Sequence, residues 1–463
     1  MKIALVQCPA WGRQNPPLAL SMLSAYLRNK KREVYLFDLN NELFHKVKDE
    51  DKRLWQLSNE AFWENKSKVL EFASKYDELL DYFVREILET EVSIVGFSTF
   101  NSSKELSLLI ASRIKKIDKN KKIIFGGPHC APHIQGKEII KECAVDMIVI
   151  GEGEVTLDEI INIIERDGKV DSYEGTWLKK DGKVIDCGNR PLIEDLNELP
   201  FADFGDFKLE SYDEPYRLPI YLSRGCPNRC VYCNENIFWH GYRSRSGLKV
   251  FEEMKYQLNK QKAVTHFDFA DSLVNANVRE LSHLADLIIK DGIRITWSGQ
   301  AMIRSYMTPE LLRKLKQSGC VCLAYGMESG SQKVLDLMRK GFRVEEAERV
   351  IRDTHNAGID AVTNFMFGFP GETDEDFEET LDFITRNREY ISTVNPSLAY
   401  TAIGVGTYLY DHPEEYNIDL SAGHLYWKSK DGENTYEKRK KRYETFCKLT
   451  SSLGIKFSYP VSI

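Results

Sequence analysis

The sequence predicts an α/β protein in which a doubly wound sheet is followed by a partial, TIM-like barrel of six strand–helix units. Two observations predict this class. Short, almost continuously apolar runs alternate with stretches whose apolar residues recur at helical spacing, as expected for parallel strands that are buried on both faces. Glycines and polar residues follow several of these runs, at the strand ends where both architectures bind ligands.

Length and composition agree with two or three globular domains. The chain has 463 residues, 42% hydrophobic and 29% charged, which is too long for one ordinary domain and too apolar for disorder. The net charge of −7 gives no reason to expect a nucleic-acid partner. The sequence contains no run of about 18 apolar residues to cross a membrane. We therefore expect a cytoplasmic protein whose ten cysteines are mostly reduced. The basic run Lys438–Arg442 is expected to be a solvated helix face.

Residues 1–168 are predicted to form the doubly wound, Rossmann-like domain. Its strands are expected near residues 3–6, 34–37, 93–97, 123–125 and 147–150, and its helices near 17–29, 104–117 and 155–165. Residues 50–90 form a helical insert whose aromatic residues fit a hydrophobic core better than a cofactor contact.

The barrel is predicted over residues 217–404, after a hairpin and connector at 169–216 and before a C-terminal extension at 405–463. Asp181 and Gly182 mark the turn of the hairpin. The barrel strands are expected at 218–223, 265–269, 293–298, 320–327, 361–367 and 397–403, with helices at 247–260, 276–290, 308–318, 331–339, 344–357 and 373–388.

Cys226, Cys230 and Cys233 follow the first predicted barrel strand with the spacing C-x3-C-x2-C. A disulfide is disfavoured in a reducing compartment. A zinc site needs a fourth ligand, which His240 or another cysteine would have to supply. Three thiolates can instead hold three irons of a [4Fe–4S] cluster and leave one iron open to a chelating substrate. We favour the cluster and keep zinc as the alternative.

The cysteine spacing, with Tyr232 before the last cysteine, resembles the signature of the radical S-adenosylmethionine superfamily. Three later segments are similar to further motifs of that family. They are Phe269–Ser272, Tyr325–Ser331 and Phe365–Thr373. Their order after the cysteines, at strand–helix spacing, makes the resemblance specific.

The resemblance implies that the open iron chelates the amine and carboxylate of S-adenosylmethionine. One electron from the reduced cluster would then cleave the sulfonium and release a 5′-deoxyadenosyl radical, chemistry that the cofactor carries while the protein positions it. Tyr232 would pack near the adenine, and Glu328 would accept hydrogen bonds from the ribose. Ser298 and Arg304 would meet the polar groups of the methionine. The predicted cofactor contacts of the barrel are Tyr232, Asp271, Ser298, Arg304, Glu328 and Ser329.

The first domain resembles the cobalamin-binding class of this superfamily through Pro16–Leu18, Val95–Ser98, Gly126–His129 and Gly151–Glu154. Segments beyond the barrel also look like this class, namely Val394–Ser397, Gly406–Tyr410 and Trp427–Thr435. Glycines at strand ends let the backbone approach a flat corrin. The predicted cobalamin contacts are Ser98, Thr99, Gly126, Gly127, Gly151, Glu152 and Gly153.

Two alternatives remain for this domain. One is a degenerate domain that has lost the cofactor, since the Asp-x-His-x-x-Gly motif by which mutase-like proteins ligate cobalt is missing. This class usually leaves cobalt without a histidine ligand, so the absence is compatible with cobalamin. The other is a nucleotide-binding domain, which the lack of Gly-x-Gly-x-x-Gly after the first strand disfavours.

The resemblance therefore implies a cobalamin-dependent radical S-adenosylmethionine enzyme that methylates an unactivated carbon. One alternative is a radical cyclisation, rearrangement or coupling on the same scaffold, with cobalamin retained or lost. Another is a non-catalytic iron–sulfur or zinc protein. We expect a small-molecule, lipid or peptide substrate and an electron donor such as flavodoxin or ferredoxin.

Overall fold

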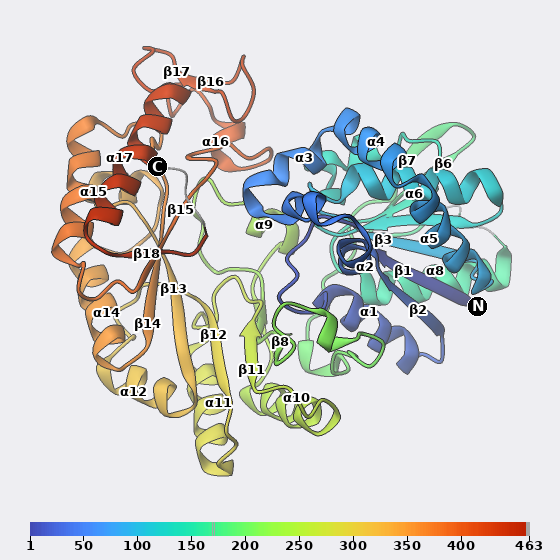
Figure 1. The fold of residues 1–463 in the computed structure, drawn as a ribbon, viewed down its shortest axis with the longest axis horizontal. Helices are drawn as coiled ribbons and strands as arrows, with labels where there is room; N and C mark the ends of the chain where they lie inside the picture. Colours follow the sequence, from blue (N-terminus) through green and yellow to red (C-terminus); the bar gives the residue numbers. More distant parts are fainter. Residues whose placement is uncertain (169, 171, 460–463) are drawn as a thin grey trace. The chain divides into compact units, whose positions relative to one another are not determined.

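The computed structural model describes residues 1–168, 170 and 172–459, and it divides the chain between Pro219 and Ile220 into two units (Figure 1). The remaining residues, 169, 171 and 460–463, belong to the predicted connector and C-terminal extension and lie outside the described residues. None of the described helices is long and apolar enough to span a bilayer.

The first unit is built on a seven-stranded sheet with the order β2-β1-β3-β4-β5-β6-β7. Its strands are β1 (Lys2–Gln7), β2 (Glu33–Asp38), β3 (Ile94–Ser98), β4 (Lys122–Gly126), β5 (Met147–Val149), β6 (Thr176–Lys180) and β7 (Lys183–Asp186). The first five strands run parallel, and the predicted hairpin adds β6 and β7 antiparallel at one edge. The strand order reverses between β1 and β3, which makes the carboxyl ends of these two strands the expected ligand crevice.

Helices cover both faces of this sheet, and β1 shows why the apolar runs are continuous. Ile3 and Leu5 pack into one hydrophobic core, whereas Ala4 and Val6 pack into the other. The helices are α1 (Leu18–Asn29), α2 (Leu39–Lys46), α3 (Glu60–Glu64), α4 (Lys66–Lys75), α5 (Asp77–Glu89), α6 (Lys104–Ile117), α7 (Lys137–Ile139) and α8 (Gly153–Asp167).

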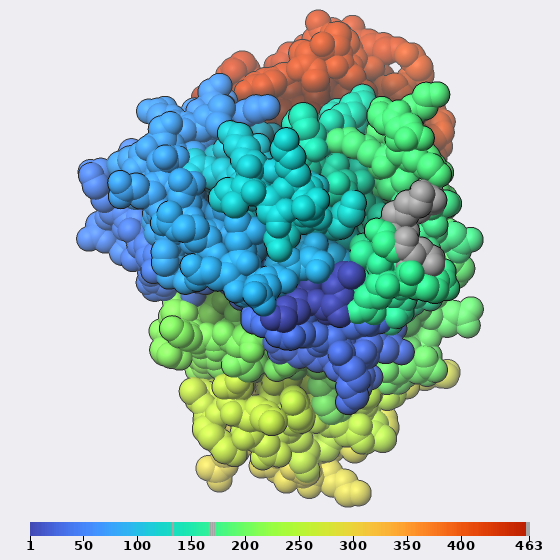
Figure 2. All heavy atoms as spheres, turned by 90° about the vertical axis from the view of Figure 1, so that its right-hand side faces the viewer, coloured from blue at the N-terminus to red at the C-terminus, as the bar shows by residue number. Residues whose placement is uncertain are grey.

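The helical insert belongs to the core of the first unit. Trp63 is fully buried, with Trp55 and Phe72 edge-on to its ring at centroid distances of 5.0 Å. Helices α3, α4 and α5 all contact α6, and Figure 2 shows their blue and cyan side chains as one continuous surface. The aromatic residues of the insert therefore serve packing, as the sequence predicts.

The second unit holds the barrel sheet, with the order β18-β15-β14-β13-β12-β11-β8. Its strands are β11 (His266–Phe269), β12 (Thr296–Ala301), β13 (Cys320–Glu328), β14 (Asp360–Phe365), β15 (Thr393–Pro396) and β18 (Lys456–Phe457), together with β8 (Arg217–Ile220), within which the division between the two units falls. The strand pairs from β11 through β18 are parallel. The helices that follow the strands are α10 (Gly247–Lys260), α11 (Val278–Asp291), α12 (Pro309–Gln317), α13 (Gln332–Leu337), α14 (Val344–Asn356) and α15 (Asp374–Arg386). The smaller elements are β9 (Ser223–Arg224), α9 (Glu235–Trp239), β10 (Arg243–Ser244), α16 (Tyr408–Asp411), β16 (Ile418–Asp419), β17 (Lys428–Ser429) and α17 (Tyr436–Ser452).

Two barrel strands lie away from their predicted positions. The sixth strand is β15 at 393–396, so the prediction of a strand at 397–403 is wrong. Tyr400 has a left-handed φ of +55°, which breaks an extended chain, and its ring packs against Tyr436 and Tyr443 of α17. The third strand, β12, begins three residues later than predicted and places Ser298 inside the strand.

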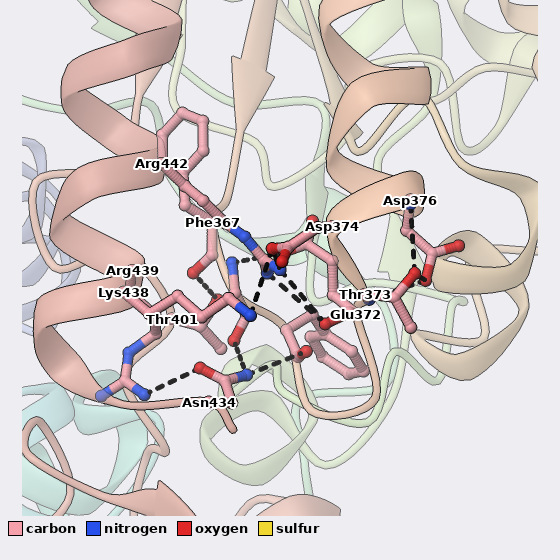
Figure 3. A network of polar contacts seen from close by, with 12 residues as sticks. Phe367, Glu372, Thr373, Asp374, Asp376, Thr401, Asn434, Lys438, Arg439 and Arg442 are labelled. Atoms are coloured by element: carbon pink, nitrogen blue, oxygen red, sulfur yellow. Dashed lines mark hydrogen bonds and ion pairs between the residues drawn. The ribbon is translucent and has the colours of Figure 1, made fainter. Parts of the chain in front are cut away.

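The basic run Lys438–Arg442 is only partly solvated, so that prediction is wrong for two of its residues. Arg439 and Arg442 are 0% and 4% exposed, because residues three apart share one face of a helix and this face of α17 packs inward. Arg442 forms ion pairs with Glu372 (2.5 Å) and Asp374 (2.8 Å), as Figure 3 shows. These pairs join α17 to the loop between β14 and α15 and to the first residue of α15.

We expect Arg442→Met to lower the free energy of unfolding by about 3–5 kcal/mol, because it leaves the buried Glu372 carboxylate without its cation. Glu372→Gln should cost less, since Arg442 keeps its pair with Asp374. Chemical denaturation of the variants measures both effects. Lys441→Met at an exposed neighbouring position is the control. If Arg442→Met and the control had the same free energy of unfolding, the ion pairs of Arg442 would not stabilise the packing of α17.

Candidate functional site

The three clustered cysteines lie on the loop that joins β9 to α9. All three are half-buried free thiols, and the N–H of Cys233 donates to the carbonyl of Cys230 (3.2 Å). Gly225 precedes them with a φ of +79°, and a Cβ there would lie 1.9 Å from the carbonyl oxygen of Gly241. Only glycine fits this position. The backbone conformation immediately before the first cysteine is therefore fixed by Gly225.

Two other segments of the second unit hold the cysteine loop through its backbone. Val231 donates its N–H to the carbonyl of Met338 (3.2 Å) and accepts the N–H of Leu409 (3.0 Å). The thiol of Cys230 lies 3.9 Å from the carbonyl oxygen of Arg339. The loop is therefore anchored on the turn after α13 and on α16.

Arg304 strengthens this anchoring. Its guanidinium donates to the side-chain oxygen of Asn228 in the cysteine loop (2.6 Å) and to the carbonyls of Ile303 (3.0 Å) and Gly341 (3.3 Å). Arg304 therefore ties the loop to the turn after α13. Its predicted contact with the methionine end of a bound molecule stays a prediction.

Glu328 occupies a strained position at the carboxyl end of β13. Its φ is +67°, and the pairing of β13 with β14 shifts between Gly326 and Glu328. A non-glycine residue in this region costs about 1–3 kcal/mol and is typical of functional sites. The strain is combined with a bulge, which re-aims a side chain. Its carboxylate accepts a hydrogen bond from the hydroxyl of Tyr232 (3.2 Å), next to the cysteines.

Lys340 completes this group, and sequence reasoning missed it. Its ammonium lies 3.3 Å from both the Glu328 carboxylate and the Tyr232 hydroxyl, and both charged side chains are nearly buried at 10% and 12% exposure. Gly326 lies beneath them, since a Cβ there would be 2.7 Å from Glu328 Oε1 and 3.1 Å from Lys340 Nζ. The sequence feature that could have identified Lys340 is its position directly after the short helix that follows the Tyr325–Ser331 motif.

Burial disfavours the ionised form of the loop thiols when no metal is bound. Burial raises the pKa of Cys230, and the nearby Lys340 and Arg304 cations oppose that rise. Burial also raises the pKa of Cys233 to about 12, and charges on Cys230 and Cys226 add to the effect. Binding of a metal centre would therefore be coupled to loss of the thiol protons. Among residues 1–168, 170 and 172–459, no group of three or more His, Cys, Asp or Glu is arranged to hold a single metal ion.

Asp271 and Ser329, both predicted cofactor contacts, lie in supporting positions. The Asp271 carboxylate accepts the N–H groups of Leu222 (2.9 Å) and Ser223 (2.5 Å), and burial raises its pKa to about 6. The hydroxyl of Ser329 lies 3.1 Å from that of Thr380 on α15. Both side chains fix strand ends around the cysteine loop, and their contact with a cofactor stays a prediction.

At the carboxyl ends of the first sheet, Thr99 and Gly127 bring two loops together. The hydroxyl and N–H of Thr99 donate to the carbonyl of Gly126 (2.7 and 2.8 Å). Gly127 has a φ of +97°, and a Cβ there would lie 2.7 Å from the Thr99 carbonyl oxygen. The predicted glycines therefore permit close backbone approach at the strand ends. Ser98 is half-buried beside them.

The glycines after β5 begin helix α8. Gly151 has a φ of +73° with open space where a Cβ would be, and Gly153 is the first residue of α8. Glu152 accepts the N–H of Ile193 (2.8 Å) from the connector. Contacts of these three residues with cobalamin stay predictions.

An exposed aromatic pair stands at the reversal point of the strand order and was missed in the sequence. Trp11, 44% exposed after β1, stacks on Phe100 after β3 with ring centroids 4.0 Å apart. Asn40 accepts the Trp11 N–H and donates to its carbonyl, both at 3.1 Å. Trp11 thus leaves part of its ring exposed after the carboxyl end of β1 while it stacks on the half-buried Phe100.

Two family models match the chain in these two regions. The radical SAM superfamily model matches residues 220–384, and the B12 binding domain model matches residues 60–161. The first range contains the cysteine loop, Glu328 and Lys340, and the second contains Thr99 and the glycines after β4 and β5.

Several curated proteins resemble the chain. An uncharacterized methyltransferase of Pyrococcus horikoshii is 26% identical over 302 residues, covering 64% of this chain and 65% of that protein. The anaerobic magnesium-protoporphyrin IX monomethyl ester cyclase of Synechocystis sp. is 26% identical over 294 residues, covering 63% and 58%. The chain thus spans less than two thirds of the length of these relatives.

Two solved structures share the fold. The radical S-adenosylmethionine methyltransferase TsrM of Kitasatospora setae, with cobalamin and a [4Fe-4S] cluster bound, has a TM-score of 0.67 at 18% identity and covers 87% of this chain and 77% of that one. The cobalamin-dependent S-adenosylmethionine radical enzyme OxsB has a TM-score of 0.65 at 18% identity and covers 98% and 62%. The likeness includes both units, since it extends over nearly the whole chain.

Proposed function

We propose, from the premise that this chain belongs to the radical S-adenosylmethionine superfamily and carries a B12-binding domain, that it is a cobalamin-dependent radical methyltransferase. The observation that carries the proposal is the cysteine loop beside the strained Glu328 and the buried Lys340. When bound, a [4Fe–4S] cluster supplies the electron that cleaves S-adenosylmethionine, and cobalamin carries the methyl group.

Cys226, Cys230 and Cys233 would hold the cluster, and the neighbouring polar group would orient S-adenosylmethionine. Lys340 provides a buried cation for the carboxylate of the methionine, because charge-assisted hydrogen bonds are strong where water is excluded. Glu328 provides acceptors for the ribose hydroxyls. Arg304 fixes the cysteine loop and is the second candidate for the carboxylate, as predicted.

The strand ends of the first sheet would hold cobalamin. Gly127 lets the backbone approach a large flat ligand, and the Trp11–Phe100 pair offers an aromatic surface of suitable shape. The substrate remains a small molecule, a lipid or a peptide, and the electron donor a flavodoxin or ferredoxin. A cytoplasmic location also stays a prediction.

Anaerobic reconstitution tests the proposal. Purified protein supplied with iron, sulfide, hydroxocobalamin and dithionite should bind both cofactors and release 5′-deoxyadenosine from S-adenosylmethionine. With substrate, S-adenosylhomocysteine should form together with 5′-deoxyadenosine. Protein that binds neither cofactor, or that keeps an intact reduced cluster without cleaving S-adenosylmethionine, would overturn the proposal. Metal analysis that finds zinc in place of iron would favour the zinc alternative.

We expect Trp11→Ala to weaken hydroxocobalamin binding about 2- to 12-fold, because an aromatic contact is worth about 0.5–1.5 kcal/mol beyond its buried area. Titration followed by the visible absorption of cobalamin measures this affinity without turnover. Tyr82→Ala, which removes an exposed aromatic ring from α5, is the control. If Trp11→Ala bound hydroxocobalamin with unchanged affinity, the corrin would not contact Trp11.

A further inference from the structure

The C-terminal extension and the cysteine loop pack into one hydrophobic core. Val231 of the cysteine loop lies in this core together with Leu409 and Trp427 of the extension. Phe369 comes from the loop after β14, residues 366–373, and is fully buried in the same core. Three segments that are distant in the sequence therefore meet beside the cysteines.

The loop after β14 contacts both members of the Tyr232–Glu328 pair. The N–H of Met366 donates to the carbonyl of Glu328 (3.0 Å). The ring of Phe369 lies edge-on to that of Tyr232, with ring centroids 6.2 Å apart, and the Tyr232 hydroxyl donates to the Glu328 carboxylate (3.2 Å). The position of this loop therefore influences where both side chains lie.

Asn434 of the extension binds two backbone carbonyls of the loop after β14. Its side-chain nitrogen donates to the carbonyls of Gly368 (2.9 Å) and Phe369 (3.4 Å). The backbone N–H of Asn434 donates to the hydroxyl of Ser429 (2.8 Å), and the residue is only 6% exposed. Loss of the side-chain nitrogen would therefore leave buried carbonyls without a donor, which is unfavourable.

Arg439 of α17 fixes the orientation of the Asn434 amide. Its Nη1 atom donates to the Oδ1 atom of Asn434 (3.2 Å). Its Nη2 atom donates to the carbonyls of Leu425 and Trp427, both at 2.9 Å, and the cation lies 4.2 Å from the centre of the Trp427 ring. Because Oδ1 faces a donor, the amide nitrogen faces the loop after β14, and Figure 3 shows Asn434 between Arg439 and that loop.

Gly368 shows how closely the loop and the extension fit together. Its φ is +67°, and a Cβ there would lie 2.2 Å from Arg439 Cγ and 3.2 Å from Asn434 Oδ1. A larger residue would therefore push the extension away from the loop. Hydrophobic packing alone does not require such close contact. A binding site does, because its residues must be held within about 0.5 Å by neighbours that are themselves fixed.

We propose that Asn434 and Arg439 are positioning residues of the S-adenosylmethionine site. They hold the loop after β14, and through it the Tyr232–Glu328 pair, in the geometry that binds the cofactor. The inference rests on the proposed function, which assigns Glu328 to the ribose hydroxyls. The C-terminal extension thereby takes part in cofactor binding, although its residues act through the loop and not on the cofactor itself.

Two substitutions of Asn434 separate positioning from packing. Asn434→Asp keeps the size of the side chain and an acceptor for Arg439, but it replaces the nitrogen that binds the loop with an oxygen. Asn434→Ala removes both contacts. In reconstituted protein we expect both variants to raise the KM for S-adenosylmethionine about 2- to 12-fold at a kcat close to that of wild type, measured by 5′-deoxyadenosine release. The change that S-adenosylmethionine causes in the electron paramagnetic resonance spectrum of the reduced cluster should require correspondingly more S-adenosylmethionine.

Thr450→Val is the matched control, because Thr450 is fully buried on α17 and its hydroxyl donates to the carbonyl of Phe446 in the same helix (2.7 Å). Iron content and thermal melting verify each variant. A wild-type KM in either Asn434 variant, or an equal rise of KM in Thr450→Val, would overturn the inference. A failure of the proposed function looks different. In that case the wild-type protein, with its cluster reduced, releases no 5′-deoxyadenosine from S-adenosylmethionine, and the inference fails with it.

Discussion

Cys230→Ala is expected to reduce cleavage of S-adenosylmethionine to background. Under the proposed function, the three thiols of the loop would be the complete protein ligand set for a cluster that keeps one iron open, and two thiolates would not hold it. The loop itself should keep its path, because Val231 is anchored by its own backbone hydrogen bonds. The expected change is therefore loss of iron and sulfide from a folded protein, measured by metal analysis and by 5′-deoxyadenosine release.

Other cysteines of the chain provide the matched comparison for this variant. Cys143 is an exposed free thiol of the first unit, and Cys322 is a half-buried thiol of β13. Alanine at either position should leave the iron content of the reconstituted protein unchanged. If Cys230→Ala kept a full cluster, or if Cys143→Ala lost it, the cysteine loop would not be the cluster site.

The sequence predicts the fold class because strands and helices depend on local patterns, and the cysteine site, which rests on an equally local pattern, stays a prediction. Apolar runs such as residues 3–6 identify strands whatever surrounds them, and three close cysteines in a polar loop predict a metal centre. The failures depend on tertiary contacts. Residues 397–403 alternate like a strand, yet Tyr400 turns into a left-handed conformation against α17. Arg442 looks solvated until Glu372, distant in sequence, is packed beside it.

The same reason explains why Lys340 was missed. A lysine after a short amphipathic helix is usually solvated, and nothing local marks this one as buried. The carboxylate that it contacts belongs to Glu328, whose φ is left-handed and which follows a shift in strand register. Neither feature has a sequence signature, since glutamate is not typical of left-handed backbone. Trp11 was missed similarly, because its partner Phe100 comes from another strand.

Lys340→Met is expected to weaken S-adenosylmethionine binding about 10- to 150-fold, because a hydrogen bond to a charged group is worth about 1.5–3 kcal/mol. Methionine keeps the aliphatic length of lysine and removes only the cation that lies 3.3 Å from Glu328 and Tyr232. Equilibrium binding to the reconstituted protein measures the effect. Lys333→Met on α13, at a 53% exposed lysine, is the control. If Lys340→Met and this control bind S-adenosylmethionine with equal affinity, Arg304 and not Lys340 would be the residue that binds the methionine carboxylate.

Gly326→Ala tests the same group without removing any of its atoms. The backbone at Gly326 is not left-handed, so alanine does not strain the backbone there and the sheet should keep its stability. Its Cβ would nevertheless lie 2.7 Å from Glu328 Oε1 and 3.1 Å from Lys340 Nζ, and these flexible ends must move. We therefore expect a higher KM for S-adenosylmethionine at an unchanged melting temperature. An unchanged KM would mean that the positions of these two charges do not matter for binding, whereas a large drop in melting temperature would mean that they mainly support the fold.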